Sequence, residues 1–331
     1  MALIDPFERH IEYLRVSITD RCNYRCGYCM PEQGVHPEGH HSQYLNFDEL
    51  TRIISAFVRL GVKKVRVTGG EPLVRKGVPG FISQISPLPG LKEIALSTNA
   101  HHLAKHADAL KQAGLDRANV SIDSLKPKLF KEITRGGDLD KVLDGVKAGI
   151  DAGLNPMKFN MVVMKGTNHT EIKDMIDFGI EHGVEVRFIE TMPIGPAGVS
   201  MMDQHYAMKE ILRDVKAHVG TDLIPCTNQS HDGPAKNFQI QNTQARIGVI
   251  SAVSDHFCDS CNRVRLTATG ILALCLGQED SVDLKTPLRA GISDEDLEAL
   301  IVKAMEKKPE RHFFRENVHN IEFRQMVSLG G

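Results

Sequence analysis

Three cysteines stand close together near the start of the chain. Cys22, Cys26 and Cys29 lie within eight residues at the spacing Cys-x3-Cys-x2-Cys, so their thiolates can converge on one inorganic centre. A four-iron cluster normally takes four thiolate ligands, and three would leave one iron open, as in reactive metal sites. The spacing therefore predicts a catalytic iron–sulfur cluster. Two alternatives stay open here, a zinc ion with a fourth ligand from elsewhere and three buried thiols without a metal.

A second set of cysteines, Cys258, Cys261 and Cys275, has the spacing Cys-x2-Cys-x13-Cys and again lacks an obvious fourth ligand. By itself this spacing is also typical of a structural zinc knuckle. Arg263 and Arg265 follow Cys261 at positions i and i+2 of an extended stretch, which sends both side chains to one side. Guanidinium groups bind phosphate in a bidentate manner. The stretch therefore predicts an anionic ligand beside a second reactive metal site.

The composition disfavours several classes of protein. Of 331 residues 41% are hydrophobic, and 40 Lys and Arg against 42 Asp and Glu give a net charge of -2. Such a balance provides no global basic field for nucleic acid or a membrane surface. Residues 1–13 carry charges where a signal peptide needs an apolar run, and no stretch approaches the ~18 apolar residues of a membrane span. We therefore expect a cytoplasmic protein.

The remaining cysteines and the histidines add no further site. Seven cysteines are an odd number, and their clustering indicates metal ligands rather than a disulfide framework. Cys226 stands apart from both sets and is interpreted as a packed thiol. The 15 histidines show no ligand spacing, so we interpret them as ordinary surface or core residues.

Short apolar runs rich in β-branched residues alternate with amphipathic helical stretches. In 48–60, for example, the apolar residues fall on one helical face, with Asp48 as the expected N-cap and Gly61 as the expected stop. Such alternation predicts parallel strands joined by right-handed crossovers. The expected strands are 13–18, 64–68, 93–98, 118–123, 157–163 and 184–190.

Within these strands one parity is apolar and the other is polar or charged. A complete eight-stranded barrel fills its interior with apolar side chains, whereas here the polar parity must line a wet or ligand-filled interior. The pattern therefore predicts an incomplete, open barrel, although an antiparallel sheet with one solvated face gives the same alternation. Five inward cations would be costly to bury without a multiply charged anion such as a triphosphate. They are Arg15, Lys64, Arg66, Lys158 and Arg187.

The loops that follow strand ends are where a barrel carries its active site. Two of them are 20–47, which holds the first cysteines, and 68–72, with the sequence TGGEP. The regular alternation stops after the sixth expected strand, and 226–236 is a polar linker. We therefore expect two domains, 1–225 and 226–331.

The cysteine loop TDRCNYRCGYCM and the TGGEP stretch resemble the signature of the radical S-adenosylmethionine (radical SAM) enzymes. The resemblance implies that the open iron of the first cluster chelates SAM. It also implies that Tyr28 lies against the SAM adenine, that Gly70 receives the SAM amino group, and that Ser121 and Met192 contact SAM. One departure is Ala100 in STNA, where members usually have Gly, which unsettles this turn and the role of the threonine in it.

A longer resemblance runs through nearly the whole chain, in LRVSITDRCNYRCGYCMP, VRVTGGEPLVR, VSIDS, FIETMPIG, CNRVRLTATG and the final Gly-Gly. Together these stretches resemble the radical SAM family that cyclises GTP in the first step of molybdenum cofactor biosynthesis. The resemblance implies an α/β fold, an incomplete (β/α)6 TIM-type barrel with a C-terminal extension that closes its open side. It also implies two [4Fe-4S] clusters, the first set of cysteines holding the one that binds SAM and the second set the one that binds the substrate.

The same resemblance implies the reaction, a carbon–carbon lyase activity. GTP would become 3',8-cyclo-7,8-dihydroguanosine 5'-triphosphate through removal of the C3' hydrogen and formation of a C3'–C8 bond. Arg263, Arg265 and the tail residues Gly330 and Gly331 would assist catalysis. The implied partners are an external electron donor, the cyclic pyranopterin monophosphate synthase as recipient of the product, and a second copy in a homodimer. The implied GTP contacts are Arg15, Lys64, Arg66, Thr98, Lys158, Arg187, Arg263, Val264 and Arg265.

Three alternative functions follow from the same residues. A peptide-modifying radical SAM enzyme with an auxiliary cluster would generally carry more C-terminal cysteines than these three. A two-cluster electron carrier would use the cysteines but would not need the inward cations. A zinc-bound nucleic-acid module would need a basic face, which the charge balance disfavours.

Overall fold

Six parallel strands in sequence order form the centre of the molecule. The computed structural model describes residues 2–34, 43–226, 233–314 and 325–330. Within them, one 12-stranded sheet has the order β12-β11-β10-β1-β2-β3-β4-β5-β6-β9-β8-β7. The strands are β1 (Tyr13–Ser17), β2 (Lys64–Thr68), β3 (Glu93–Thr98), β4 (Arg117–Ser121), β5 (Lys158–Val163), β6 (Glu185–Glu190), β7 (Leu223–Pro225), β8 (Lys236–Ile240), β9 (Arg246–Ile250), β10 (Arg263–Leu266), β11 (Ile271–Ala273) and β12 (Ser281–Asp283).

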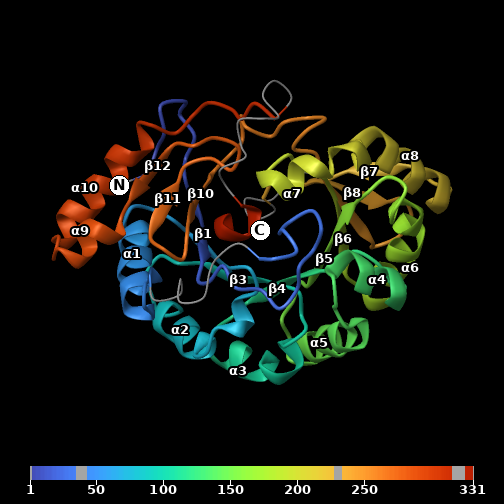
Figure 1. The fold of residues 1–331 in the computed structure, drawn as a ribbon, viewed down its shortest axis with the longest axis horizontal. Coiled ribbons are helices and arrows are strands. Elements are labelled where there is room, and N and C mark those ends of the chain that lie inside the picture. The colour runs from blue at the N-terminus through green and yellow to red at the C-terminus, as the bar shows by residue number, and fades with distance from the viewer. Residues whose placement is uncertain (1, 35–42, 227–232, 315–324, 331) are drawn as a thin grey trace.

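Helices cover the outer face of the curved sheet, and the last turn of the chain, Met326–Leu329, lies inside the ring of strands (Figure 1). In the described residues no helix is long and apolar enough to cross a membrane. The helices are α1 (Phe47–Arg59), α2 (Val78–Ile85), α3 (Ala107–Gln112), α4 (Pro127–Thr134), α5 (Leu139–Asp151), α6 (Ile172–His182), α7 (Gly195–Ser200), α8 (Met208–Val219), α9 (Lys285–Arg289) and α10 (Asp294–Met305).

The alternation predicted for the strands is confirmed. Leu14 and Val16 of β1 belong to the main hydrophobic core, which the helices complete from outside. Arg15, between them, lines a pocket on the inner side. Successive side chains of a strand point to opposite faces, so the same division continues along the neighbouring strands. The apolar parity therefore stabilises the barrel wall, and the polar parity is left for a ligand.

The barrel is incomplete, as predicted. β10 pairs in parallel with β1, and β9 pairs in parallel with β6, so the C-terminal region extends the sheet at both edges. Beyond β10 the sheet continues through the antiparallel strands β11 and β12, and beyond β9 it continues through the antiparallel strands β8 and β7. The sheet ends at β12 and β7 without closing. The sheet also runs across the predicted boundary at residue 225, because β7 ends there and pairs with β8. The division into 1–225 and 226–331 stays a prediction.

Helix α1 differs from its predicted start. The N-cap is Asn46, not Asp48: the Asn46 side chain accepts from the Glu49 backbone N–H, and the Glu49 side chain accepts from that of Asn46. This reciprocal capping box satisfies two backbone donors, which a residue already inside the helix cannot do. Gly61, with φ of 100°, follows the last helical turn, as expected of a C-terminal stop.

Candidate active site

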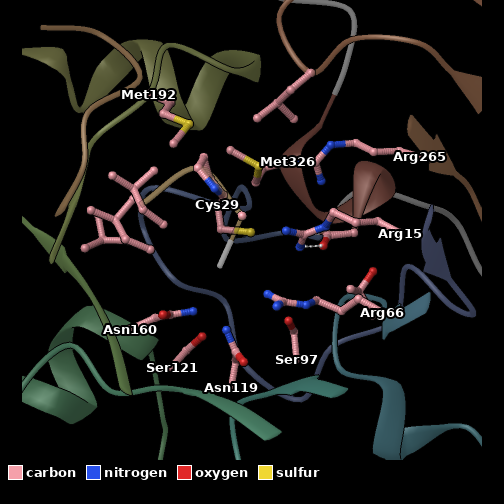
Figure 2. A pocket seen from close by; sticks show the side chains of 18 of the residues that line it. Arg15, Cys29, Arg66, Ser97, Asn119, Ser121, Asn160, Met192, Arg265 and Met326 are labelled. Atoms are coloured by element: carbon pink, nitrogen blue, oxygen red, sulfur yellow. Dashed lines mark hydrogen bonds between the residues drawn. The ribbon is translucent and has the colours of Figure 1, made fainter. Parts of the chain in front are cut away.

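One pocket on the inner side of the sheet collects both sets of cysteines. The first set lies in the loop after β1, and the second lies on the segments that flank β10 and β11, more than 200 residues later. Figure 2 shows Arg15, Arg66 and Arg265 pointing into this pocket toward Cys29, with Asn119, Ser121 and Asn160 on its floor. The predicted site residues that line it are Arg15, Cys22, Cys26, Tyr28, Cys29, Arg66, Gly70, Thr98, Ser121, Arg187, Met192, Cys258, Cys261, Arg263, Val264, Arg265, Cys275 and Gly330.

The loop between β2 and α2 is more than a turn. The Gly70 N–H donates to the Thr19 carbonyl over 2.7 Å, which ties TGGEP to the cysteine loop. A Cβ at Gly70 would lie 2.5 Å from the Arg21 carbonyl oxygen, so only glycine permits this approach. Glu71 is fully buried and accepts from the Asn99 backbone N–H over 2.6 Å. The loop thus positions the backbone edge beside the first cysteines.

The first cysteines lie in an environment that opposes negative charge. Burial raises the pKa of Cys29 to about 12, with Cys22 and Asp123 adding to the shift. Burial also raises the pKa of Cys26 well above its usual range. Asp123 accepts a hydrogen bond of 2.8 Å from the Tyr28 hydroxyl. A bound metal centre would supply the positive charge that favours the thiolate forms against this burial.

The second cysteines lie among cations instead. Burial opposes ionisation of Cys261, yet Arg263 and Lys308 lower the pKa of its thiol to about 7. The Lys308 Nζ lies 3.8 Å from the Cys261 Sγ. Burial raises the pKa values of Cys258 and Cys275. The two sets therefore differ in electrostatic surroundings although both open onto one pocket.

The spacing of the thiols bears on the zinc alternatives. In the described part of the chain, no three His, Cys, Asp or Glu side chains are placed so that they could bind one metal ion. A zinc ion draws its sulfur ligands to about 2.3 Å from a single point, whereas a four-iron cluster spreads them over its corners. Each set provides three thiols that open onto one pocket, which suits a four-iron cluster with one open iron.

The cations of the strands divide into two layers. Arg66 lines the pocket, and its Nε is buried without a hydrogen-bond partner among the described residues. Burial, aided by repulsion from Arg117 and Arg15, lowers the pKa of Arg66 to about 9. An anion in the pocket would relieve both the missing hydrogen bond and the repulsion.

Lys64 and Lys158 do not line this pocket. The Lys64 Nζ lies 3.0 Å from the Glu93 Oε1, and the Lys158 Nζ lies 3.2 Å from the Glu185 Oε1. Both pairs sit at the first residues of neighbouring strands, in register across the sheet. Glu185 also holds the Arg187 Nε at 2.5 Å. The chain thus supplies carboxylates for the layer farthest from the loops, so the expected need for a multiply charged anion does not extend to the cations of this layer.

The C-terminal tail enters the same pocket. The Arg15 Nη2 donates to the Gly330 carbonyl over 2.7 Å, and the Arg265 Nη1 donates to the Leu329 carbonyl over 3.1 Å. Gly330 has φ of 83°, and a Cβ there would collide with the Thr68 hydroxyl. The tail thus requires glycine at this position. Gly331 lies outside the described residues.

The departure at Ala100 leaves the turn intact. Ala100 is buried with φ of 60°, a left-handed conformation that glycine adopts more easily. Its N–H donates to the Thr98 hydroxyl over 3.0 Å, and that hydroxyl donates to Glu71 over 2.8 Å. The hydrogen bonds therefore hold Thr98 at the pocket despite the alanine.

Sequence reasoning missed several residues of the pocket. Tyr13 shares the parity of Arg15 and lines the pocket, but an aromatic residue at a strand start carries no signal of its own. Burial alone would raise its pKa, yet Arg66, Arg15, Lys64 and Arg263 together lower it to about 7. Glu190 also lines the pocket, together with Asn119, Asp123 and Asn160, which belong to the polar parity predicted to face inward.

Comparison with known proteins agrees with this geometry. Residues 16–179 match the Radical SAM superfamily, and residues 184–314 match Molybdenum Cofactor Synthesis C. The solved structure of Streptococcus suis SuiB bound to S-adenosylmethionine shares the fold with a TM-score of 0.64 at 14% identity, over 94% of this chain and 78% of that one. The fold and site thus define a radical SAM enzyme, a class that uses SAM and a [4Fe-4S] cluster.

The relatives narrow the class. The chain is 76% identical to the GTP 3',8-cyclase of Hydrogenovibrio crunogenus over 100% of both chains. It is 42% identical to the GTP 3',8-cyclase of Alkaliphilus metalliredigens over 99% of both chains. The chain belongs to the GTP 3',8-cyclase family.

Proposed function

We propose that the chain converts GTP to 3',8-cyclo-7,8-dihydroguanosine 5'-triphosphate, the first step of molybdenum cofactor biosynthesis. The observation that carries the proposal is that two sets of three cysteines and a group of arginines open onto one pocket. A radical generator alone would need only the first set. A second metal centre and a cationic wall beside it suit a substrate with a ring that can ligate iron and a polyphosphate.

The first set, Cys22, Cys26 and Cys29, would hold a [4Fe-4S] cluster with SAM. Bound together, they supply the radical chemistry that removes the C3' hydrogen of the substrate. Gly70 would present its backbone to SAM, because no side chain intervenes, and Tyr28, whose hydroxyl donates to Asp123, would offer its ring to the adenine. Ser121 and Met192 line the pocket and would make further SAM contacts.

The second set, Cys258, Cys261 and Cys275, would hold a second [4Fe-4S] cluster whose open position faces the guanine of GTP. Arg263 and Arg265 of β10, with Arg15 and Arg66 of the adjoining strands, would bind the phosphates. Thr98, Val264 and Arg187 line the same pocket. Lys64 and Lys158, which we expected as direct GTP contacts, would act from the layer behind, where their carboxylate partners hold them.

These residues would orient the ribose so that C3' faces the first set and C8 of the base lies over C3'. Holding reacting atoms in such a geometry accounts for a large part of enzymatic rate enhancement. Leu329 and Gly330 close the pocket from inside the ring and hold Arg265 and Arg15 through their carbonyls. Gly330 would thereby help to keep water from the reacting atoms, and we propose that Gly331, which lies outside the described residues, also assists catalysis.

The proposal extends to the surroundings of the enzyme. A one-electron donor outside the chain would reduce the clusters, and cyclic pyranopterin monophosphate synthase would take up the product. We propose a homodimer that works in the cytoplasm, without nucleic acid or membrane.

The experiment that tests the proposal measures 5'-deoxyadenosine in the anaerobically reconstituted, reduced chain supplied with SAM, with and without GTP, beside iron analysis. We expect formation that depends on GTP and about eight irons per chain, as two four-iron clusters require. Arg263→Ala should lower kcat/KM for GTP by roughly 10- to 100-fold, because a charged hydrogen bond to phosphate is lost.

Arg59→Ala is the matched control, since Arg59 is exposed on α1 and pairs with Asp294. It should leave kcat/KM unchanged. SAM cleavage that is indifferent to GTP would keep the radical SAM class but reject this substrate. Cyclised product without any effect of Arg263→Ala would reject the assigned phosphate contact alone.

A further inference from the structure

A buried lysine lies beside the second set of cysteines. Lys308, just after α10, is only 3% exposed. Its Nζ donates to the Leu274 carbonyl over 2.6 Å, to the Arg263 carbonyl over 3.2 Å and to the Cys261 Sγ over 3.8 Å. Leu274 immediately precedes Cys275. One ammonium group therefore bridges the two segments that carry Cys261 and Cys275, with all three of its N–H donors in use.

Lys308 has no carboxylate partner among the described residues, in contrast to the other cation that supports these loops. Arg9 donates to the Cys258 carbonyl over 2.9 Å, but its charge is balanced by buried Asp5 at 2.6 Å. Burying an ammonium without a counter-charge is costly. Among the described residues, the group beside Lys308 that can carry negative charge is the Cys261 thiol, 3.8 Å from the Nζ. Thiolates that ligate a metal centre would therefore compensate the charge of Lys308.

The two cysteine sets consequently differ in the sign of their neighbours. Two buried carboxylates, Asp123 and Glu71, stand beside the first set with one cation, Arg25, whereas Lys308, Arg263 and Arg9 stand beside the second. An electron added to an iron–sulfur cluster increases its negative charge. Nearby cations and hydrogen bonds to the sulfurs stabilise that state, so they raise the reduction potential.

We propose that Lys308 is a positioning residue that raises the reduction potential of the second cluster, through its charge and its hydrogen bond to the Cys261 sulfur. The inference rests on the proposed function only in requiring a cluster at the second set. The couple concerned takes up one electron from an external donor and releases it again, with no bond made or broken. The second cluster would then accept an electron more readily than the first.

The test uses the full chain, reconstituted anaerobically. Wild type, Lys308→Met and Lys308→Arg are poised with dithionite and redox mediators, and the reduced clusters are followed by electron paramagnetic resonance. Each is also prepared with Cys22, Cys26 and Cys29 replaced by Ala, so that the second cluster is seen alone. Lys307→Met is the matched control, because Lys307 is the exposed neighbour.

We expect Lys308→Met to bind iron as wild type does. It should lower the reduction potential of the second cluster and leave that of the first unchanged. At the wild-type midpoint its reduced-to-oxidised ratio should fall about tenfold, which for a one-electron couple is about 59 mV. Lys308→Arg keeps the charge and should restore most of the shift. Lys307→Met should behave as wild type.

Several results would overturn the inference. An unchanged potential in iron-loaded Lys308→Met, or an equal shift in Lys307→Met, would do so and leave the proposed function intact. About four irons per wild-type chain would also overturn the proposal that the second set of cysteines holds a cluster. If Lys308→Met does not bind iron at the second set, Lys308→Gln is measured in its place. A second cluster in Lys308→Gln with the wild-type reduction potential would contradict the inference. Failure of both neutral variants to load would assign Lys308 to cluster assembly instead.

Discussion

Tyr13 is the residue whose ionisation most clearly reports the charge of the pocket. Its ordinary pKa of 10.0 falls to about 7 because Arg66, Arg15, Lys64 and Arg263 outweigh the effect of burial. A pKa lowered in the folded state means that ionised Tyr13 contributes stability that is fully present above pH 10 and is lost as pH falls toward 7. We expect Tyr13→Phe to remove this contribution.

The measurement is an ultraviolet titration of tyrosinate in the cluster-free chain, wild type minus Tyr13→Phe. The difference should appear with a midpoint near pH 7 and move to higher pH when GTP is added, because the triphosphate neutralises the same arginines. Tyr206→Phe is the control, since burial and Asp214 raise the pKa of Tyr206 to about 12. A Tyr13 midpoint at or above pH 10 would contradict this account of the pocket.

At the scale of elements, the start of α1 distinguishes the observed cap from the predicted one. Asn46→Ala removes the acceptor for the Glu49 N–H and should lower the free energy of unfolding by about 1 kcal/mol. Asp48→Ala removes only a first-turn carboxylate and should cost a few tenths of a kcal/mol. Urea denaturation of both variants checks the difference. Equal losses would mean that the capping box contributes nothing beyond charge.

The position of an inward side chain along its strand decides whether it lines the pocket. Side chains near the starts of β2, β3, β5 and β6 form the paired layer of Lys64, Glu93, Lys158 and Glu185. Later positions of the same parity, such as Arg66, reach the pocket. Lys64 and Arg66, two residues apart on β2, therefore have different surroundings. Lys64 pairs with Glu93 in the layer away from the loops, and Arg66 lines the pocket.

At the scale of the whole molecule, Glu190 joins the barrel to the second cysteine region. This β6 residue is 1% exposed. One of its oxygens accepts from the Val253 and Ser254 N–H groups at 3.0 and 2.9 Å, and the other accepts from the Met208 N–H at 2.7 Å and from the Ser254 hydroxyl. Glutamine offers only one oxygen, so Glu190→Gln leaves donors facing an amide NH2.

We expect Glu190→Gln to cost roughly 1–3 kcal/mol locally. Hydrogen exchange at Val253 and Ser254 should accelerate, and iron bound at the second set should fall, while the first set stays loaded. Exposed Glu306→Gln removes the same charge and should change neither quantity. Unaltered exchange at 253–254 would show that the loop is held by other contacts.

Residue types and local spacing were enough to predict the chemistry and the wall of the barrel. Thiolates within eight residues of one loop can converge on one centre, so the spacing of Cys22, Cys26 and Cys29 predicts a common ligand. Strand parity is likewise local, because successive side chains alternate between faces whatever the strand packs against. The open barrel, the inward arginines and the glycine-rich loop beside the cysteines could therefore be predicted before any coordinates.

Other features depended on tertiary contacts. The meeting of Cys29 with Cys261 in one pocket, the carboxylates that neutralise Lys64 and Lys158, and the place of Lys308 all join residues that are far apart in the chain or on different strands. Electrostatic partners depend on distances of a few ångströms, and spacing along the sequence carries no information about such distances between separate elements. Strand parity thus indicated which charges face inward, whereas only the packing of the strands and the C-terminal region decided which of them remain to meet a ligand.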